Sequence, residues 1–449
     1  MSWEFRRNLW IQLTPHRLIA TSIVLGVVFL TADRIGALRW VSAGVFFLFA
    51  GFWGTRRAAD SIMEEVIGGT WQNQRMSAVG AWPMAWGKLF GATAFAWYGA
   101  GIAWIVRAYA DFSDAPLRVR FDAVEHIDLI AMLVFAVLAQ AMSLLVALIQ
   151  MRRRRRGRHM TVGIGQIAGL MVLIPFLDRW SSERVMEWYG NAIPAWSFLN
   201  LSALAFLFWA MVAIHQLMRA ELQYRDMTLR VPAFAVFLMT YLSGFVDIGL
   251  APEIYRAVVL QVAGTAALLL YYAALLAAPG EPVALLRLMR ALRAGDWKLI
   301  GELAPSWLPA GLIFAAVAIA VIVNALASPV TLPKLGFWWL RYAIDSYASW
   351  VAAILVFAAR DAGIVLLFAI GKRPERADVN SIVSLAVLHG LLPWTWLAFQ
   401  SPSLAGLTSP VPGASTALML VAALAQLLLL GVLLNRRLAQ LQPKGVAYA

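Results

Sequence analysis

Apolar residues gather along this chain into long runs that short polar segments separate. Twelve runs predict membrane-spanning helices, each of which needs roughly 20 predominantly apolar residues. In the first half of the chain the runs cover residues 18–31, 40–54, 89–106, 129–150, 160–177 and 195–217. In the second half they cover residues 231–250, 257–278, 308–325, 350–370, 382–399 and 417–434. Several runs are shorter than a full span, so their limits are approximate, and the run 40–54 gives the weakest signal. The pattern predicts an all-α polytopic membrane protein of about twelve transmembrane helices.

Composition supports this class of protein. The 449 residues are 61% hydrophobic and 14% charged, with a mean hydropathy of +0.73, whereas soluble domains are roughly half apolar and a quarter charged. No polar stretch is long enough for a separate soluble core, so we expect no appended catalytic domain. The chain has no cysteine, which excludes disulfides and thiolate metal sites.

Positive charge predicts how the runs are oriented. With the N-terminus inside the cell, inside segments hold 26 of the 37 Lys and Arg residues, outside segments hold 10, and Arg360 lies within a run. Cytoplasmic loops carry an excess of these residues, so this split and the even number of runs place both termini in the cytoplasm. The basic run 152–158 is interpreted as an anchor on anionic membrane lipids, and no nucleic-acid partner is expected.

The polar segment 64–89, EEVIGGTWQNQRMSAVGAWPMAWGKL, has the signals of two short helices instead of a simple loop. The second predicted span extends into the cytoplasm with Glu64 and Glu65 on its water-facing side, and Gly68-Gly69 ends it. Thr70 is the expected N-cap of a short helix over residues 71–79. Such a helix is either a docking element or an ordinary interfacial helix.

This segment resembles the cytoplasmic loop of the permeases of type-2 ABC exporters. That loop has a Glu, a Gly-Thr a few residues later, a short helix with a Ser/Thr-Pro, and a Gly-Lys that opens the third span. The corresponding residues, with the Trp that begins the short helix, are Glu64 or Glu65, Gly69, Thr70, Trp71, Ser77, Gly87 and Lys88. Ala78 replaces the proline, and the short helix is more polar than usual in the family. Segment 3–13 is similar to the amphipathic elbow helix that precedes the first span in the family.

The resemblance implies that the short helix couples this chain to a separate ATP-binding subunit, present in two copies. ATP and magnesium would then bind to that partner, and this chain would bind no cofactor and would not be an enzyme. The sequence agrees, because Gly87-Lys88 and Gly371-Lys372 lack the glycine spacing and the Ser/Thr of a phosphate-binding P-loop. The resemblance also implies a bacterial-type inner membrane as the location.

A faint internal repeat relates the two halves at an offset of 226 residues. Gly69, Trp71 and Pro83 correspond to Gly295, Trp297 and Pro309 in a second predicted cytoplasmic loop. Three matching residues also arise by chance, but each half has an elbow segment (219–230 in the second), two spans, a cytoplasmic loop and four spans. We expect two fused six-span permease halves, residues 1–218 and 219–449, with possible second coupling residues Gly295, Trp297 and Pro309.

Two alternatives come from the loop TADRIGALRW, residues 31–40. It is similar to a loop of major-facilitator transporters, which also have twelve spans, so an ion-coupled secondary transporter is the second hypothesis. That family has the loop after its second span, in the cytoplasm, whereas here it follows the first span and is predicted outside. Asp33 in the same loop could serve a lipid-linked-sugar glycosyltransferase, but those enzymes have long external loops.

Three polar residues inside predicted spans are candidates for an intramembrane site. Arg360 and Asp361 lie near the middle of the tenth span and His389 near the middle of the eleventh. Such residues face protein or a water-filled cavity, so they either fix helix packing or contact a substrate or proton. Adjacent residues point about 100° apart on a helix, so Arg360 and Asp361 need not pair with each other. The five histidines form no metal-binding pattern, and no metal site is predicted.

Overall fold

The computed structural model describes residues 3–76, 79–114, 123–152, 158–174, 185–222, 224, 230–277, 282–327, 347–371, 376–411 and 413–441. The chain divides into two compact units. Unit 1 contains residues 1–186 and 192–226, and unit 2 contains residues 187–191 and 227–449. The expected boundary at residues 218/219 lies within the last helix of unit 1.

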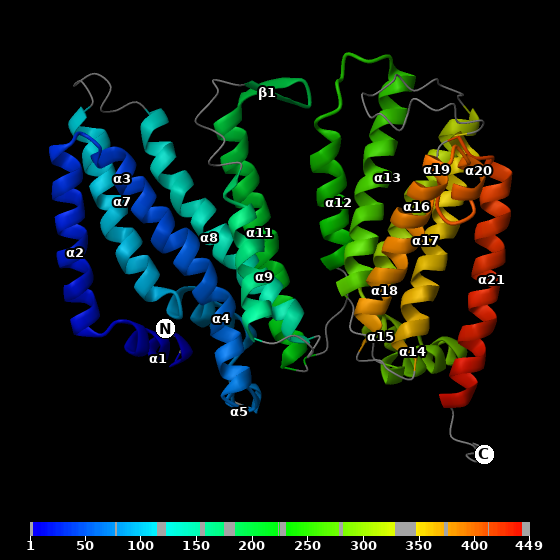
Figure 1. Cartoon of the computed structure of the whole chain (residues 1–449), viewed down its shortest axis with the longest axis horizontal. Coiled ribbons are helices and arrows are strands. Elements are labelled where there is room, and N and C mark those ends of the chain that lie inside the picture. The colour runs from blue at the N-terminus through cyan, green and yellow to red at the C-terminus, as the bar shows by residue number, and fades with distance from the viewer. Residues whose placement is uncertain are drawn as a thin grey trace. The chain divides into compact units, whose positions relative to one another are not determined.

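Unit 1 is built from helices (Figure 1). They are α1 (Trp3–Gln12), α2 (Pro15–Arg34), α3 (Leu38–Phe46), η1 (Phe47–Trp53), α4 (Gly54–Ile67), α5 (Trp71–Met76), α6 (Ala81–Trp86), η2 (Gly87–Gly91), α7 (Ala94–Asp114), α8 (Ala123–Arg152), α9 (Arg158–Met171) and α11 (Ala195–Glu221), where η denotes a π-helix. Helices α3, η1 and α4 form one continuous 30-residue helix, and the short α5 lies just beyond its end (Figure 1).

Unit 2 is also helical. Its helices are α12 (Arg230–Ser243), α13 (Pro252–Ala277), α14 (Pro282–Ala294), α15 (Trp297–Leu303), α16 (Trp307–Ala327), α17 (Tyr347–Ala369), α18 (Ala377–Ala386), η6 (Val387–Leu391), α19 (Leu392–Ala398), α20 (Pro402–Ala405) and α21 (Thr416–Leu441). Helices α13, α16 and α17 share a core in which Tyr271 stacks on Phe314 and donates its hydroxyl hydrogen to the carbonyl of Ala358 (2.9 Å).

The predicted all-α class is confirmed, and long apolar helices make the protein suited to a membrane. Within the described residues, nine helices are long and apolar enough to cross a bilayer. Three of the twelve predicted runs have a different form. Run 89–106 belongs to a pair of helices bent by 54°, and runs 160–177 and 231–250 correspond to the short apolar helices Thr161–Met171 and Arg230–Ser243. The predicted count of twelve spans is therefore not established.

Small residues allow close packing in unit 1. A Cβ on Gly169 of α9 would lie 2.5 Å from the carbonyl oxygen of Ala139 in α8, and one on Gly165 would lie 2.9 Å from that of Ser143. This is the small-xxx-small spacing by which apolar helices approach each other closely. Ser143 also donates to the carbonyl of Thr55 in α4 (2.7 Å), which ties a third helix to the same place.

The π-helix η1 interrupts the usual backbone hydrogen bonding of the second predicted span. Side-chain amides bond two of its carbonyls: Gln140 Nε2 donates to the carbonyl of Ala50 (2.8 Å) and Gln166 Nε2 to that of Phe52 (3.1 Å). Buried backbone groups need such partners, especially where no water is present. The polar residues within the runs of α8 and α9 therefore have a structural role.

A short β-hairpin, β1 (Val185–Trp188) and β2 (Asn191–Pro194), was not predicted. Its turn holds Tyr189 and Gly190 at φ = +48° and +68°, a conformation typical of two-residue hairpin loops. The turn packs on α12, because the Tyr189 amide donates to the Gly244 carbonyl (2.7 Å) and Trp188 Nε1 donates to the Tyr241 carbonyl (3.0 Å). Residues 187–191 thus belong to unit 2.

Candidate functional site

Helix α4 ends at the predicted glycine pair. Gly69 has φ = +69°, in the left-handed region that glycine adopts without a steric penalty. Its amide donates to the carbonyl of Val66 (3.4 Å), and the amide of Thr70 donates to the carbonyl of Glu65 (3.0 Å). These two bonds are those of a Schellman motif, which satisfies the last carbonyls of a helix and turns the chain. The chain therefore leaves α4 sharply and enters α5.

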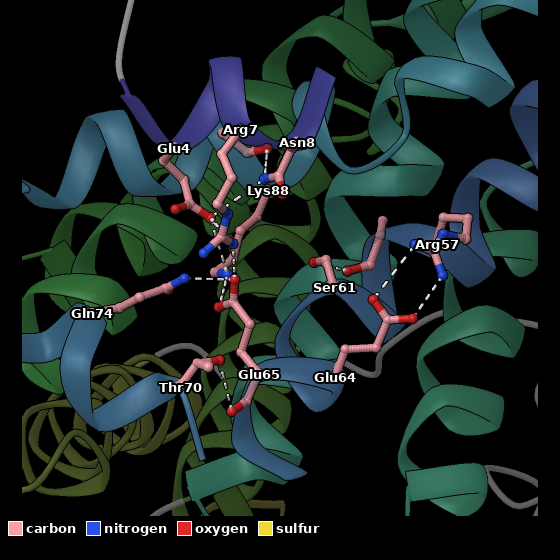
Figure 2. A network of polar contacts seen from close by, with 12 residues as sticks. Glu4, Arg7, Asn8, Arg57, Ser61, Glu64, Glu65, Thr70, Gln74 and Lys88 are labelled. Atoms are coloured by element: carbon pink, nitrogen blue, oxygen red, sulfur yellow. Dashed lines mark hydrogen bonds and ion pairs between the residues drawn. The ribbon is translucent and has the colours of Figure 1, made fainter. Parts of the chain in front are cut away.

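Glu65 lies at the centre of a polar network (Figure 2). Its Oε2 accepts a hydrogen bond from Lys88 Nζ, and its Oε1 accepts from Arg7 Nη2 (2.5 Å) and Gln74 Nε2 (2.6 Å). Lys88 is fully buried, and its Nζ also lies 5.4 Å from the ring centroid of Trp71. A buried ammonium requires such an anionic partner. Glu65 and Lys88 therefore join the two ends of the 64–89 loop.

Helix α1 supplies the other two charges of this network. Arg7 bonds Glu4 (3.1 Å) as well as Glu65, and the buried carboxylate of Glu4 lies 3.7 Å from Lys88 Nζ. Two carboxylates thus face two cations, and the four formal charges cancel. Asn8 Nδ2 adds a hydrogen bond to Glu4 Oε1 (3.3 Å). The elbow-like helix, the end of α4 and the start of the third predicted span are joined in one cluster.

Glycines on η2 make room for α1. A Cβ on Gly87 would lie 2.6 Å from Glu4 Cγ and 3.3 Å from the Phe5 amide nitrogen, and one on Gly91 would lie 3.0 Å from Asn8 Cβ. The close approach lets Asn8 Nδ2 donate to the carbonyl of Gly87 (3.1 Å). Gly87 is therefore needed because a larger residue would collide with α1. Lys88, next to it, contacts Glu65.

Two predictions about this loop are wrong. Glu65 was expected to face water with Glu64, but Glu65 is buried because Lys88, Arg7 and Gln74 surround its carboxylate. Glu64 points away from the network, is partly exposed, and pairs with Arg57 Nη1 (2.9 Å). Thr70 does not cap α5 with its side chain; its hydroxyl instead donates to the Glu65 carbonyl (3.4 Å).

Helix α5 has a buried face and an exposed face. Trp71 and Gln74 are buried, and Arg75 Nε donates to the carbonyl of Glu221 at the end of α11 (2.8 Å). Gln72, Asn73 and Met76 are exposed on the other side, with Met76 at 79%. The helix is shorter than the predicted range 71–79. Ser77 and Ala78 lie outside the described residues.

The second loop begins with the same backbone geometry. Gly295 has φ = +67°, its amide donates to the Leu292 carbonyl (3.3 Å), and the Asp296 amide donates to the Ala291 carbonyl (3.1 Å). A short helix starting at Trp297 follows, as α5 starts at Trp71. The Asp296 side chain accepts from the Leu299 amide (3.0 Å) and caps α15.

The two short helices differ in burial. No residue of α15 is buried, and Trp297 is 80% exposed, whereas Trp71 is 6% exposed. Pro309 lies in the first turn of α16, where a proline is tolerated because the amides there have no partner within the helix. The described second loop therefore shares the turn of the first without its buried charged network.

A second polar cluster lies in unit 2, around Asp361 of α17. Asp361 Oδ2 bonds His389 Nε2 of η6 (2.7 Å) and the Tyr272 hydroxyl of α13 (2.5 Å). Its Oδ1 accepts from Arg360 Nε (2.9 Å) and Nη2 (2.7 Å). Arg360 and Asp361 therefore do pair, because the long arginine side chain bends back to its neighbour. Both are buried, and the cluster joins three helices of unit 2.

Helix α21 and the segment before it complete this cluster. Arg360 Nη1 donates to Gln426 Oε1 (2.9 Å) and to the Thr408 carbonyl (2.7 Å), and the guanidinium carbon lies 4.6 Å from the Phe357 ring centroid. His389 lies in a π-helix, and Pro393 follows it by four residues. Pro393 lacks the amide that would bond the His389 carbonyl in an α-helix, which accounts for the local change of helix type.

Sequence reasoning did not find several members of these networks. Glu4, Arg7 and Asn8 have the i, i+3, i+4 spacing that places side chains on one face of a helix, and this was the available signal. Gln74 appeared as an unusual polar residue in the short helix of the loop, and its hydrogen bond to Glu65 explains that polarity. Tyr272 and Gln426 carry no local signal, because the residues of the cluster that they bond, Asp361 and Arg360, are more than 60 residues away in sequence.

Within the described part of the chain, no group of three or more His, Asp and Glu side chains could hold a metal ion. No protein-family model matches the chain, and neither a curated protein nor a solved structure is similar to it.

Proposed function

We propose that this chain is the transmembrane permease of a type-2 ABC exporter, two six-span halves fused in one chain, in a bacterial-type inner membrane. A separate ATP-binding subunit, in two copies, would bind ATP and magnesium and hydrolyse the ATP. The observation that carries this proposal is the meeting of Glu65, Gly69, Trp71 and Lys88 around one loop. These are residues by which the sequence resembles the coupling loop of that family.

The two faces of α5 suit a coupling element. Its exposed face, with Met76, is available to a partner, while Trp71 and Gln74 hold its other face against the Glu65 network. A displacement of α5 would move Glu65 and with it α4. Lys88 and Arg7, which bond Glu65, would carry the motion to the start of the third predicted span and to α1. Because these contacts are buried and charged, separating them is unfavourable, so the elements would move together.

The second loop supports the idea of two fused halves. Both loops end a helix with a glycine at nearly the same positive φ, and both then start a short helix at a tryptophan, 226 residues apart. The described second loop lacks counterparts of Glu65 and Lys88, so we propose that the first loop transmits most of the motion. Trp297, which is 80% exposed, would make the corresponding contact with the second copy of the partner.

Site-specific crosslinking tests this function. The chain has no cysteine, so Met76→Cys and Ile35→Cys each introduce a single exposed thiol, with Ile35 at 71% exposure in the turn after α2. The partner to test is an ATP-binding subunit whose gene adjoins the gene of this chain, coexpressed with it. We expect Met76→Cys to crosslink to that protein and to be labelled from the cytoplasm, and Ile35→Cys to be labelled from outside without crosslinking.

Absence of crosslinking at Met76 in a complex that hydrolyses ATP would contradict the assignment of α5. Absence of any stable complex would contradict the ABC class itself.

The Asp361 cluster favours a second candidate function, an ion-coupled secondary transporter. A buried carboxylate bonded to a histidine within apolar helices is a group that can bind a proton during transport. In this case the purified chain alone, in vesicles with an imposed proton gradient, would accumulate a solute from a labelled panel, and Asp361→Asn would abolish accumulation. Under the ABC proposal the chain alone accumulates nothing.

A further inference from the structure

A groove opens in unit 2 between one end of α17, the start of α18 and the end of α21. Its volume is about 690 Å³, within the range of roughly 300–1,000 Å³ that small-molecule sites occupy. The three helix ends lie close together near the C-terminal end of α21 (Figure 1). This is the end that the distribution of positive charge places in the cytoplasm.

The lining of this groove is divided by chemistry. Arg436 and Arg437 contribute two positive charges, and none of the described residues that line the groove is acidic. Leu367, Phe368 and Leu433 contribute an apolar surface from the neighbouring turns of α17 and α21. The groove therefore places the two guanidinium groups beside an apolar surface.

We propose that this groove binds an anionic phospholipid from the cytoplasmic leaflet. Guanidinium groups bind phosphate oxygens through paired hydrogen bonds and stay charged at every physiological pH. Basic pockets between membrane helices on the cytoplasmic side suit anionic lipid headgroups. The apolar side chains would contact an acyl chain, which distinguishes a lipid from a soluble phosphate. The site does not depend on coupling to an ATPase, because none of its residues belongs to either loop.

Native mass spectrometry of the full chain in mild detergent tests this site. The probes are phosphatidylglycerol and phosphatidylcholine with the same acyl chains, and glycerol phosphate as the headgroup alone. We expect the chain to retain phosphatidylglycerol in preference to phosphatidylcholine, and glycerol phosphate not to displace it. An interfacial basic residue contributes about 1 kcal/mol, which is about 5-fold in binding, so the double variant R436Q/R437Q should weaken phosphatidylglycerol binding about 25-fold.

Two further variants complete the experiment. R290Q/R293Q removes the same charge from exposed positions on α14 outside the groove, and it should leave the binding constant unchanged. Leu433→Asn should weaken phosphatidylglycerol binding by changing the apolar part of the groove. Equal loss in the two double variants would show general charge attraction and overturn the site. Displacement by glycerol phosphate at the concentration of the lipid would show a soluble-phosphate site and overturn the lipid.

Discussion

The ammonium of Lys88 bonds the carboxylate of Glu65, 23 residues earlier in the chain, and their side chains are only 1% and 10% exposed. Lys88 begins the third predicted span, and Glu65 ends the helix that contains the second. The pair therefore holds the end of α4 against the start of η2. Its two residues are also among those by which the sequence of the loop resembles that of an exporter permease.

Neutralising Glu65 should be far more disruptive than neutralising its neighbour. Glu65→Gln leaves two cations, Lys88 and Arg7, facing the single carboxylate of Glu4. One buried positive charge is then uncompensated, which costs about 3–5 kcal/mol of unfolding free energy. Glu64→Gln is the matched control, because Glu64 is partly exposed and pairs with Arg57, so its loss costs below about 1 kcal/mol. Denaturant unfolding in detergent measures both. Equal destabilisation would contradict the burial of the Glu65 carboxylate.

Gly69 and Gly295 should respond alike to alanine. Both have positive φ and open space where a Cβ would lie, so each substitution should cost about 1–2 kcal/mol from backbone strain alone. Gly301→Ala is the control, because Gly301 lies within α15 with open space around it, and alanine there should be neutral or stabilising. Thermal unfolding distinguishes the cases. A destabilising Gly301→Ala together with a neutral Gly69→Ala would contradict the positive φ assigned to Gly69.

Gly87→Ala should loosen α1 from the rest of unit 1. The added methyl group would displace Glu4, whereas Gly101→Ala in α7 meets no neighbour within 4 Å. Trypsin should cleave after Arg7 faster in the Gly87 variant than in the unmodified chain, and at an unchanged rate in the Gly101 variant. If cleavage is unchanged in both, α1 does not rest on η2.

A stability measurement can show whether Asp361 fixes the packing of the helices or serves only in transport. Asp361→Asn leaves Arg360 buried beside a neutral side chain and should lower the unfolding free energy by about 3–5 kcal/mol. Asp247→Asn is the control, in the exposed turn before α13. It should change the unfolding free energy by less than about 1 kcal/mol, including the weakening of the bond from the Gly249 amide. Comparing the two unfolding curves in detergent checks this. An Asp361 variant as stable as the unmodified chain would mean that the aspartate does not fix packing.

Much of the fold could be predicted from the apolar runs, because a bilayer imposes length and hydrophobicity on each spanning helix. The run 89–106 is a bent pair instead of a straight span, since the helix breaks at residues 92–93, directly after the π-helix Gly87–Gly91. The hairpin of β1 and β2 escaped prediction because each strand is four residues long, too short for alternation to be recognised.

The loop could be located from sequence, but the burial of its charges could not. Glu64 and Glu65 are identical neighbours, and their different surroundings come from Arg57 on one side and from Arg7 and Lys88 on the other. The positive φ of Gly69 was predictable, because a glycine directly after a helix commonly adopts this conformation whatever the rest of the fold. Which carboxylate is buried depends on residues up to 58 positions away.

The place of α1 in the charged network has a consequence for how the protein is made. Arg7 is synthesised long before Lys88, and at about 5–20 residues per second the 81 residues from 8 to 88 take roughly 4–16 s to add. Glu65 is made before Lys88, so Glu4 and Arg7 meet their partners one after the other, and the network is complete only when Lys88 has been made. The first helix to be synthesised is therefore among the last to take its final place. When α1 docks on α4 and η2, the second and third predicted spans must already be in position.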